Sequence, residues 1–245
     1  MRNSRLKNII TAVLLTVLVV SVVLVIKFIF LRPFKMDIVK HFTFSRDDSL
    51  KEWQVKAFKG RVAYSIGKAD GKGFVRAASD NTASALYYKV KLKTEKRPLL
   101  SWKWKVEKFP SKRGGESLKD PKQDDFGARV YVIFPSFFFT KTKALEYIWT
   151  ESVKEGTISP SPYSKNLQLV VVESGKREGA GWVSEERDIY EDYIEAFGEP
   201  PKSDIGAIAF MTDADSTKSS AEALYDEIKI GYKTEEVPHK TGDEQ

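Results

Sequence analysis

Cysteine is absent from this 245-residue chain, and histidine occurs only twice, at His41 and His239. The missing cysteine excludes a disulfide framework, a thiolate metal site and a cysteine nucleophile. His41 follows an apolar N-terminal segment and His239 lies in a polar tail, so a Ser-His-Asp triad and most zinc sites are excluded as well. The sequence also lacks a Gly-x-Ser-x-Gly elbow, a phosphate-binding glycine-rich loop and a dinucleotide fingerprint. If the protein is an enzyme, carboxylates must carry the chemistry.

The basic excess of the chain belongs to its N-terminus. The formal net charge is +6, but residues 1–35 contain six lysines and arginines and no acidic residue. The remainder therefore holds 34 basic and 34 acidic residues. A domain without net charge gives no reason to expect a phosphate-backbone partner, so we predict no nucleic acid among its ligands.

The one long apolar stretch runs from Ile9 to Leu31 and is interrupted by a charge only at Lys27. A helix of about 20 apolar residues spans a bilayer core. No small-residue cleavage site follows it, which favours an uncleaved signal anchor over a signal peptide. Three lysines and arginines precede the stretch, and Lys27 near its end makes four with Arg32, Lys35 and Lys40 behind it, so the charge count does not decide the orientation. The short basic start favours a cytoplasmic tail and an exported domain.

The remaining chain predicts a single mainly β domain over residues 36–233, preceded by the cytoplasmic tail and anchor (1–35) and followed by a flexible tail (234–245). Apolar residues alternate with polar ones in short runs that are separated by turn residues. Helix is expected only at Ile189–Phe197, with Gly198 ending it. We predict an antiparallel β-sandwich of the jelly-roll kind with one short helix. The expected strands are Phe42–Phe44, Trp53–Ala57, Val62–Ile66, Gly73–Ala78, Ser84–Lys91, Leu99–Val106, Ala128–Phe134, Ala144–Trp149, Asn166–Glu173, Trp182–Asp188, Ile205–Thr212 and Ala223–Tyr232.

Acidic residues gather in several loops, and the run Asp213-Ala-Asp215-Ser-Thr follows an apolar strand. Oxygen ligands at alternate positions suit a hard cation such as calcium. Asp226 in the last strand adds a third candidate ligand. Asx turns favour the same residues, and the run lacks the glycine and glutamate of an EF-hand loop. A calcium site and a metal-free turn both remain open.

Aromatic residues give a second kind of candidate site. In the strand from Ala128 to Phe134, Arg129 and Tyr131 share one face, and a tryptophan or tyrosine exposed on a sandwich face can stack on a sugar ring. We expect ligand binding by Arg129, Tyr131, Trp149, Trp182 and Asp125. For Trp149 and Trp182 a place in the core is the equal alternative, whereas Trp53, Trp102 and Trp104 are expected in the core.

The stretch Asp124-Asp-Phe-Gly-Ala-Arg-Val-Tyr-Val-Ile-Phe134 resembles a bacterial family known as domain of unknown function 3047. Further matching stretches are Leu145–Trp149, Val170–Gly175, Glu186–Tyr193, Phe197–Pro201 and Ala209–Thr217. The resemblance implies export in a Gram-negative bacterium, and hence an inner-membrane protein whose domain faces the periplasm. The family has no established activity, so it supplies no catalytic residues. More distantly, the chain resembles jelly-roll carbohydrate-binding modules.

These observations favour a membrane-anchored periplasmic binding domain that recognises a glycan or cell-envelope polymer, rather than an enzyme. No cofactor is expected apart from calcium at the acidic run. One alternative is a scaffold or assembly subunit of an envelope complex that has a membrane-protein partner. The other is a carboxylate-dependent glycan hydrolase or lyase.

Overall fold

The structure is a computed structural model that describes residues 35–176 and 181–234. The chain divides into two compact units, Met1–Lys35 and Met36–Gln245. The expected anchor, Ile9–Leu31, lies outside the described residues, as does all but Thr234 of the expected tail. Within the described ranges, no helix is long and apolar enough to cross a membrane.

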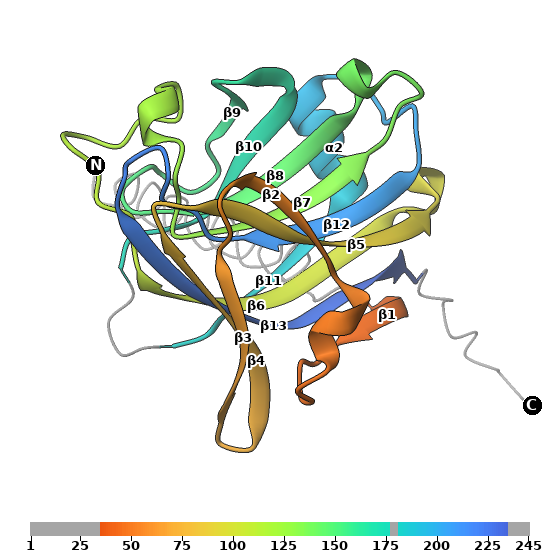
Figure 1. The fold of residues 1–245 in the computed structure, drawn as a ribbon. Coiled ribbons are helices and arrows are strands. Elements are labelled where there is room, and N and C mark those ends of the chain that lie inside the picture. Colours follow the sequence, from red (N-terminus) through yellow and green to blue (C-terminus); the bar gives the residue numbers. More distant parts are fainter. Residues whose placement is uncertain (1–34, 177–180, 235–245) are drawn as a thin grey trace, which may run out of the picture. The chain divides into compact units, whose positions relative to one another are not determined.

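Two sheets pack face to face in the second unit and enclose its core (Figure 1). The first sheet has the order β11-β6-β13-β4-β3, and its longest strand, β13, also pairs with β1. All its pairings are antiparallel. At Gly231 an added Cβ would lie 2.0 Å from the Asp37 carbonyl oxygen, so glycine allows β1 to reach β13. The strands are β1 (Met36–Phe42), β3 (Ala63–Ala69), β4 (Lys72–Asp80), β6 (Pro98–Lys108), β11 (Val183–Asp188) and β13 (Ser220–Lys233).

The second sheet has seven strands in the order β2-β5-β12-β7-β8-β10-β9. Strand β10 pairs parallel with β8, so the expected antiparallel sandwich is mixed at this one place. The cause is the position of β9, which follows β8 in the chain but lies one strand farther out. Strand β10 then pairs antiparallel with β9 and lies between β9 and β8. The strands are β2 (Gln54–Lys59), β5 (Ala83–Leu92), β7 (Ala128–Phe134), β8 (Lys143–Thr150), β9 (Ile158–Ser161), β10 (Ser164–Ser174) and β12 (Ile205–Met211).

Aromatic side chains from both sheets meet in the core. Trp102 and Trp104 project from β6 toward the second sheet, where their rings lie 5.3 Å from Tyr147 and 5.7 Å from Trp149. All four side chains are essentially inaccessible to water. Alternation along each strand explains this, because every second residue of β6 and β8 faces inward. The prediction that Trp102 and Trp104 are core residues is confirmed.

Helix α2 (Ile189–Phe197) begins where β11 ends. The Asp188 side chain accepts hydrogen bonds from the backbone N–H groups of Tyr190 and Glu191, each at 3.2 Å, and so caps the first turn. Gly198 ends the helix with φ +70°, a conformation that glycine adopts at little cost. On its buried face, Tyr193 packs against Phe134 with ring centroids 4.7 Å apart. The short 3-10 helices are Ser49–Glu52, Thr94–Lys96, Pro121–Gln123 and Phe139–Lys141.

Candidate functional site

A groove of about 730 Å³ runs along the outer face of the seven-stranded sheet. Its floor lies on two neighbouring strands, where the outward positions of β5 and β12 carry Ala83, Ala85, Ala207 and Ala209. Because these side chains are small, this part of the face lies lower than the surrounding larger side chains. The remaining lining residues are Lys56, Phe58, Tyr87, Lys89, Asp124, Arg129, Tyr131, Ile133, Pro135, Glu146, Tyr163, Leu167, Gly206, Met211, Asp213, Asp215 and Ser216.

Two tyrosines stand on either side of the alanine floor. Ala209 on β12 pairs with Tyr87 on β5 and with Tyr131 on β7. Because neighbouring strands lie about 4.8 Å apart, the two tyrosine backbones are separated by roughly 10 Å. Tyr131 packs along the floor against Ala83, Ala85 and Met211. The result is a slot that is flanked by the two tyrosines and has the methyl group of Ala209 at its base.

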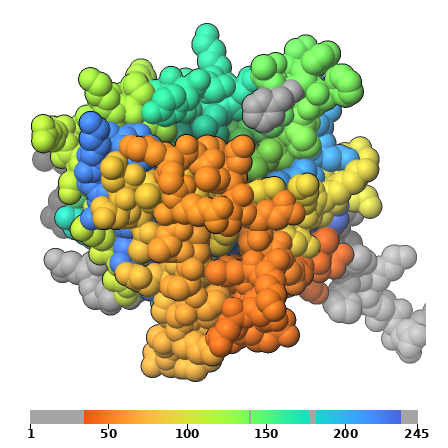
Figure 2. All heavy atoms as spheres, viewed as in Figure 1, coloured from red at the N-terminus to blue at the C-terminus, as the bar shows by residue number. Residues whose placement is uncertain are grey.

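Two further aromatic residues form the rim of the groove. Phe58 on β2 is 63% exposed, and Tyr163 in the β9–β10 turn is 65% exposed. The Tyr163 hydroxyl donates to the Pro121 carbonyl oxygen at 3.0 Å, which fixes the direction of this ring. In Figure 2, β2 (orange) and the β9–β10 turn (teal) both stand at the surface of this side. Large exposed aromatic residues at the edge of a cavity are typical of a binding site.

Arg129 occupies one end of the groove and is almost fully buried. Its Nε donates to Asp213 Oδ1 at 2.8 Å and its Nη1 to Glu146 Oε1 at 2.5 Å. Its Nη2 donates to the Asp124 carbonyl oxygen. The guanidinium also lies 4.6 Å from the centre of the Phe126 ring. The arginine thereby joins β7, β8 and the two segments that carry Asp124 and Asp213.

Burial at this end shifts the acidic groups toward their neutral forms. It raises the pKa of Glu146 to about 7, with Arg129 opposing the rise and Asp124 adding to it. Burial also raises the pKa values of Asp213 and Asp124, and Arg129 again opposes both shifts. One guanidinium therefore offsets the charge of three neighbouring carboxyl groups only in part.

Two carboxylate oxygens at this end lack a hydrogen-bond partner among the described residues. They are Glu146 Oε2 and Asp124 Oδ1, and both are inaccessible to water. Glu146 as a whole is 0% exposed, yet its side chain lines the groove. A buried acceptor without a donor costs free energy, so these two oxygens leave this end of the groove short of hydrogen-bond donors.

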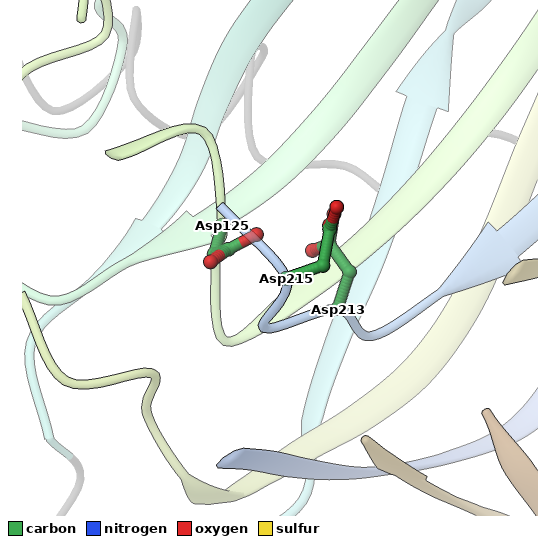
Figure 3. Close-up of side chains that lie close together, drawn as sticks. All are labelled: Asp125, Asp213 and Asp215. Carbon is green, nitrogen blue, oxygen red and sulfur yellow. The ribbon is translucent and has the colours of Figure 1, made fainter. Parts of the chain in front are cut away.

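The loop after β12 brings three further oxygens together. Oxygen atoms of Asp125, Asp213 and Asp215 all lie within 4.8 Å of one another, and Figure 3 shows the three side chains converging. Asp125 Oδ2 accepts from the backbone N and the Oγ1 of Thr217, both at 2.6 Å, and so fixes the loop. Asp226 lies apart from this cluster, on β13 opposite Lys103. The structure thus groups Asp213 and Asp215 with Asp125 instead of Asp226.

A family model matches residues 51–229, which extend from the 3-10 helix before β2 to near the middle of β13. The chain belongs to the family described as protein of unknown function (DUF3047). The predicted family is confirmed. No curated protein matches the chain.

Several solved carbohydrate-binding modules are similar to the chain over most of their length. The CBM22-1 xylan-binding domain from Paenibacillus barcinonensis Xyn10C is 13% identical with a TM-score of 0.41, covering 83% of this chain and 99% of that one. TmCBM27, described for specific mannan recognition, is 9% identical with a TM-score of 0.38, covering 82% and 99%. The family 30 module of the Clostridium thermocellum cellulase Cel9D-Cel44B is 8% identical with a TM-score of 0.40, covering 75% and 93%. Scores this low indicate remote likeness and assign no ligand to the DUF3047 domain.

The structure separates the predicted ligand-binding residues into two groups. Arg129 and Tyr131 line the groove of the DUF3047 domain, and Asp125 lies beside it in the acidic cluster. Trp149 is 1% exposed and packs on Trp104 between the sheets, so it offers no face for a ligand. Trp182 is 38% exposed, but it packs on Phe74 of β4, which belongs to the other sheet. Neither tryptophan lines the groove.

Sequence reasoning missed Glu146, Tyr87, Phe58 and Tyr163. A signal for Glu146 exists, because it interrupts the apolar run Leu145–Trp149 at a position that alternation points outward, beside Tyr131 on the neighbouring strand. A single acid inside an apolar strand of the DUF3047 domain thus marks the groove. The other three residues gain their role from strand pairing and turn position, which the sequence does not reveal.

Proposed function

We propose that this DUF3047 member is a membrane-anchored periplasmic protein whose β-sandwich binds a glycan or cell-envelope polymer in the groove on its seven-stranded sheet. The slot between Tyr87 and Tyr131 above Ala209 is the observation that carries this proposal. A sugar ring has apolar C–H faces and a polar edge of hydroxyl groups. Phenol rings and methyl groups match the faces, while the two hydroxyls donate to Gln54 and Glu146 and so hold the rings in place.

The arrangement of the groove supports a chain-like ligand. Exposed aromatic residues, Phe58 and Tyr163, stand at the rim, while the charged groups gather around Arg129 at one end. A cavity of about 730 Å³ is within the range that accommodates small ligands. We therefore place sugar units along the alanine floor, with one unit reaching the polar end.

The N-terminal segment supports the membrane part of the proposal. Ile9–Leu31 is long enough to span a bilayer, and the positive charge of the chain is concentrated around it. Anchoring would hold the groove near the envelope polymer. Protease treatment of spheroplasts from the native host tests the orientation. A periplasmic domain is cut in intact spheroplasts, and a domain that is cut only after lysis contradicts this placement.

Glycan binding is tested with the full chain in detergent micelles on an array of bacterial and plant polysaccharides, followed by calorimetry with any ligand found. We expect Tyr87→Ala to weaken binding at least tenfold, because it removes one side of the slot. Ala209→Phe fills the slot and should abolish binding. Trp182→Ala, an aromatic truncation on the other sheet, is the matched control and should bind normally. Absence of any glycan binding by the wild-type chain, or full binding by Ala209→Phe, refutes the proposal.

One observation favours a second candidate, a glycan hydrolase or lyase. The pKa of Glu146 is about 7 because the group is buried, and a general acid needs a pKa near the working pH. Asp213 is the nearby second carboxyl, since both acids bond to the same guanidinium. Release of new reducing ends or unsaturated products from the bound glycan, lost in Glu146→Gln, would establish catalysis. We favour binding because the Arg129 network already engages an oxygen of each acid.

A further inference from the structure

The acidic end of the groove gathers more carboxyl groups than its buried cation can keep ionised. Asp124, Glu146, Asp213 and Asp215 all line the groove, and Arg129 is the buried cation paired with the first three. Such a site repels anionic polymers and attracts a cationic group.

Two lysines of the described structure lie close to this end, and two more line the groove farther from it. Lys112 pairs with Glu116 at 2.6 Å, and Lys59 donates to the backbone carbonyl oxygen of Asp215 at 3.2 Å. Lys56 and Lys89 line the groove from β2 and β5, which are separated from β7 by β12. Among the described residues, Arg129 is thus the cation that forms ion pairs with Asp124, Glu146 and Asp213.

Two acceptors at this end point independently to a missing donor. Glu146 Oε2 and Asp124 Oδ1 are buried and have no hydrogen-bond partner among the described residues. Both residues line the same groove. A primary ammonium group has three donors and no acceptor, so it can donate to more than one carboxylate and neutralise charge at once. A sugar hydroxyl has only one donor and no charge.

From this geometry we infer that the acidic end recognises a protonated amino group, so the ligand is a glycan that contains amino sugars with free, unacetylated amines. The inference rests on the proposed function, because it names the class of glycan that the groove takes. Glu146 and Asp124 accept the ammonium hydrogens, and Asp213 and Asp215 add attraction at longer range. An N-acetyl group would replace the ammonium by a neutral amide with one donor and a bulky carbonyl group.

Calorimetry on the full chain in detergent micelles tests this recognition with two probes of one backbone. The probes are glucosamine hexasaccharide, fully deacetylated, and N-acetylglucosamine hexasaccharide at pH 6.5. We expect the deacetylated probe to bind at least tenfold more tightly. Equal affinity, or preference for the acetylated probe or a neutral glycan, overturns the inference while the proposed function stands. Failure of every glycan to bind removes the proposed function itself.

Variants assign the preference to the two acceptors. Glu146→Gln should reduce the deacetylated-to-acetylated affinity ratio at least fivefold. Asp124→Asn, at a side chain that is 11% exposed, tests the same point if the first variant does not fold. Glu185→Gln is the matched control, a partly buried acid on β11 that does not line the groove, and it should leave the ratio unchanged. An unchanged ratio in both groove variants contradicts the assignment.

A metal ion is the competing occupant, since Asp125, Asp213 and Asp215 could hold one. Calcium chloride titrated into the full chain, with the thermal midpoint as readout, separates the two. We expect calcium to leave the thermal midpoint of the wild-type chain unchanged. A specific site would instead show a rise that is lost in Asp215→Asn. If such a rise occurs and calcium blocks the deacetylated probe, the acidic end belongs to the metal and the ammonium inference fails.

Discussion

Glu146 Oε1 accepts hydrogen bonds from both Tyr131 and Arg129, at 3.1 Å and 2.5 Å. The tyrosine lies directly opposite Glu146 on the neighbouring strand, and the arginine is two residues earlier on the same strand as the tyrosine. One oxygen therefore couples the aromatic side of the groove to its charged end. The other oxygen of the same carboxyl, Oε2, has no partner among the described residues. This difference between the two oxygens makes Glu146 the most informative residue to change.

The titration of Glu146 should be visible in the stability of the unliganded protein. Its folded-state pKa is about 7, raised by burial above the ordinary value of 4.5. The folded state therefore binds more protons than the unfolded state between these values, and the free energy of unfolding falls as pH rises through this window. The shift corresponds to a loss on the order of 3 kcal/mol. Urea unfolding at pH 5, 6, 7 and 8 measures it, and Glu146→Gln should flatten the slope. If Glu146→Gln keeps the wild-type pH dependence of the free energy of unfolding, another group causes it.

A second buried acid, Glu185, should extend the fall in stability to a higher pH. Burial and the charge of the nearby Glu173 raise the pKa of Glu185 to about 8. Glu173 lies on β10 of the seven-stranded sheet and Glu185 on β11 of the other, so the pair joins the two sheets. The raised value again means that stability falls with rising pH, here continuing from pH 7 to pH 8 after Glu146 has lost its proton. Glu185→Gln should abolish the loss in that interval, while Glu146→Gln keeps it. Identical profiles for the two variants would contradict the assignment.

Local sequence patterns predicted most of the fold, because alternation and turn residues act over short distances. Ala128–Phe134 and Ile189–Phe197 were expected with the bounds that β7 and α2 have. Strand β9 was missed, since Pro160 within it and Pro162 after it read as loop, although proline is tolerated at the edge of a sheet. The first strand was expected at Phe42–Phe44 but runs from Met36 to Phe42, where most side chains are exposed and alternation is weak.

The site was less predictable than the fold because it depends on pairing between distant segments. Arg129 and Tyr131 were found from their shared strand face, which is a local property. The convergence of Glu146 and Asp213 on Arg129 depends on which strands are neighbours. Trp149 could not be assigned to core or surface from composition alone. Its strand alternation, which points it to the same side as Leu145 and Tyr147, does assign it to the core.

The loop that carries Asp213 and Asp215 should depend on Asp125 for its conformation. Asp125 accepts two hydrogen bonds at 2.6 Å from Thr217 and one at 3.3 Å from the Ser216 backbone N. Asp125→Ala leaves these donors without their acceptor in a partly buried place, so we expect a loss of about 1–3 kcal/mol in the free energy of unfolding. Amide exchange at residues 216 and 217 should accelerate at least tenfold. Asp215→Asn, in the same loop but partly exposed, is the control, and a similar effect there would refute a specific role for Asp125.

Truncating Trp149 and truncating Trp182, which both lie outside the groove, should affect stability to very different extents. Trp149 is enclosed between the sheets, and its Nε1 donates to the Gly175 carbonyl oxygen at 2.9 Å. Trp149→Ala should therefore cost about 3–5 kcal/mol in the free energy of unfolding, through the cavity and the lost hydrogen bond. Trp182 contacts the Phe74 ring and remains 38% exposed, so Trp182→Ala should cost less than about 1 kcal/mol. Trp149→Phe separates packing from ligand contact, because it retains most of the buried ring and should keep wild-type glycan affinity. Loss of affinity in a folded Trp149→Phe protein would show that Trp149 contributes to ligand binding.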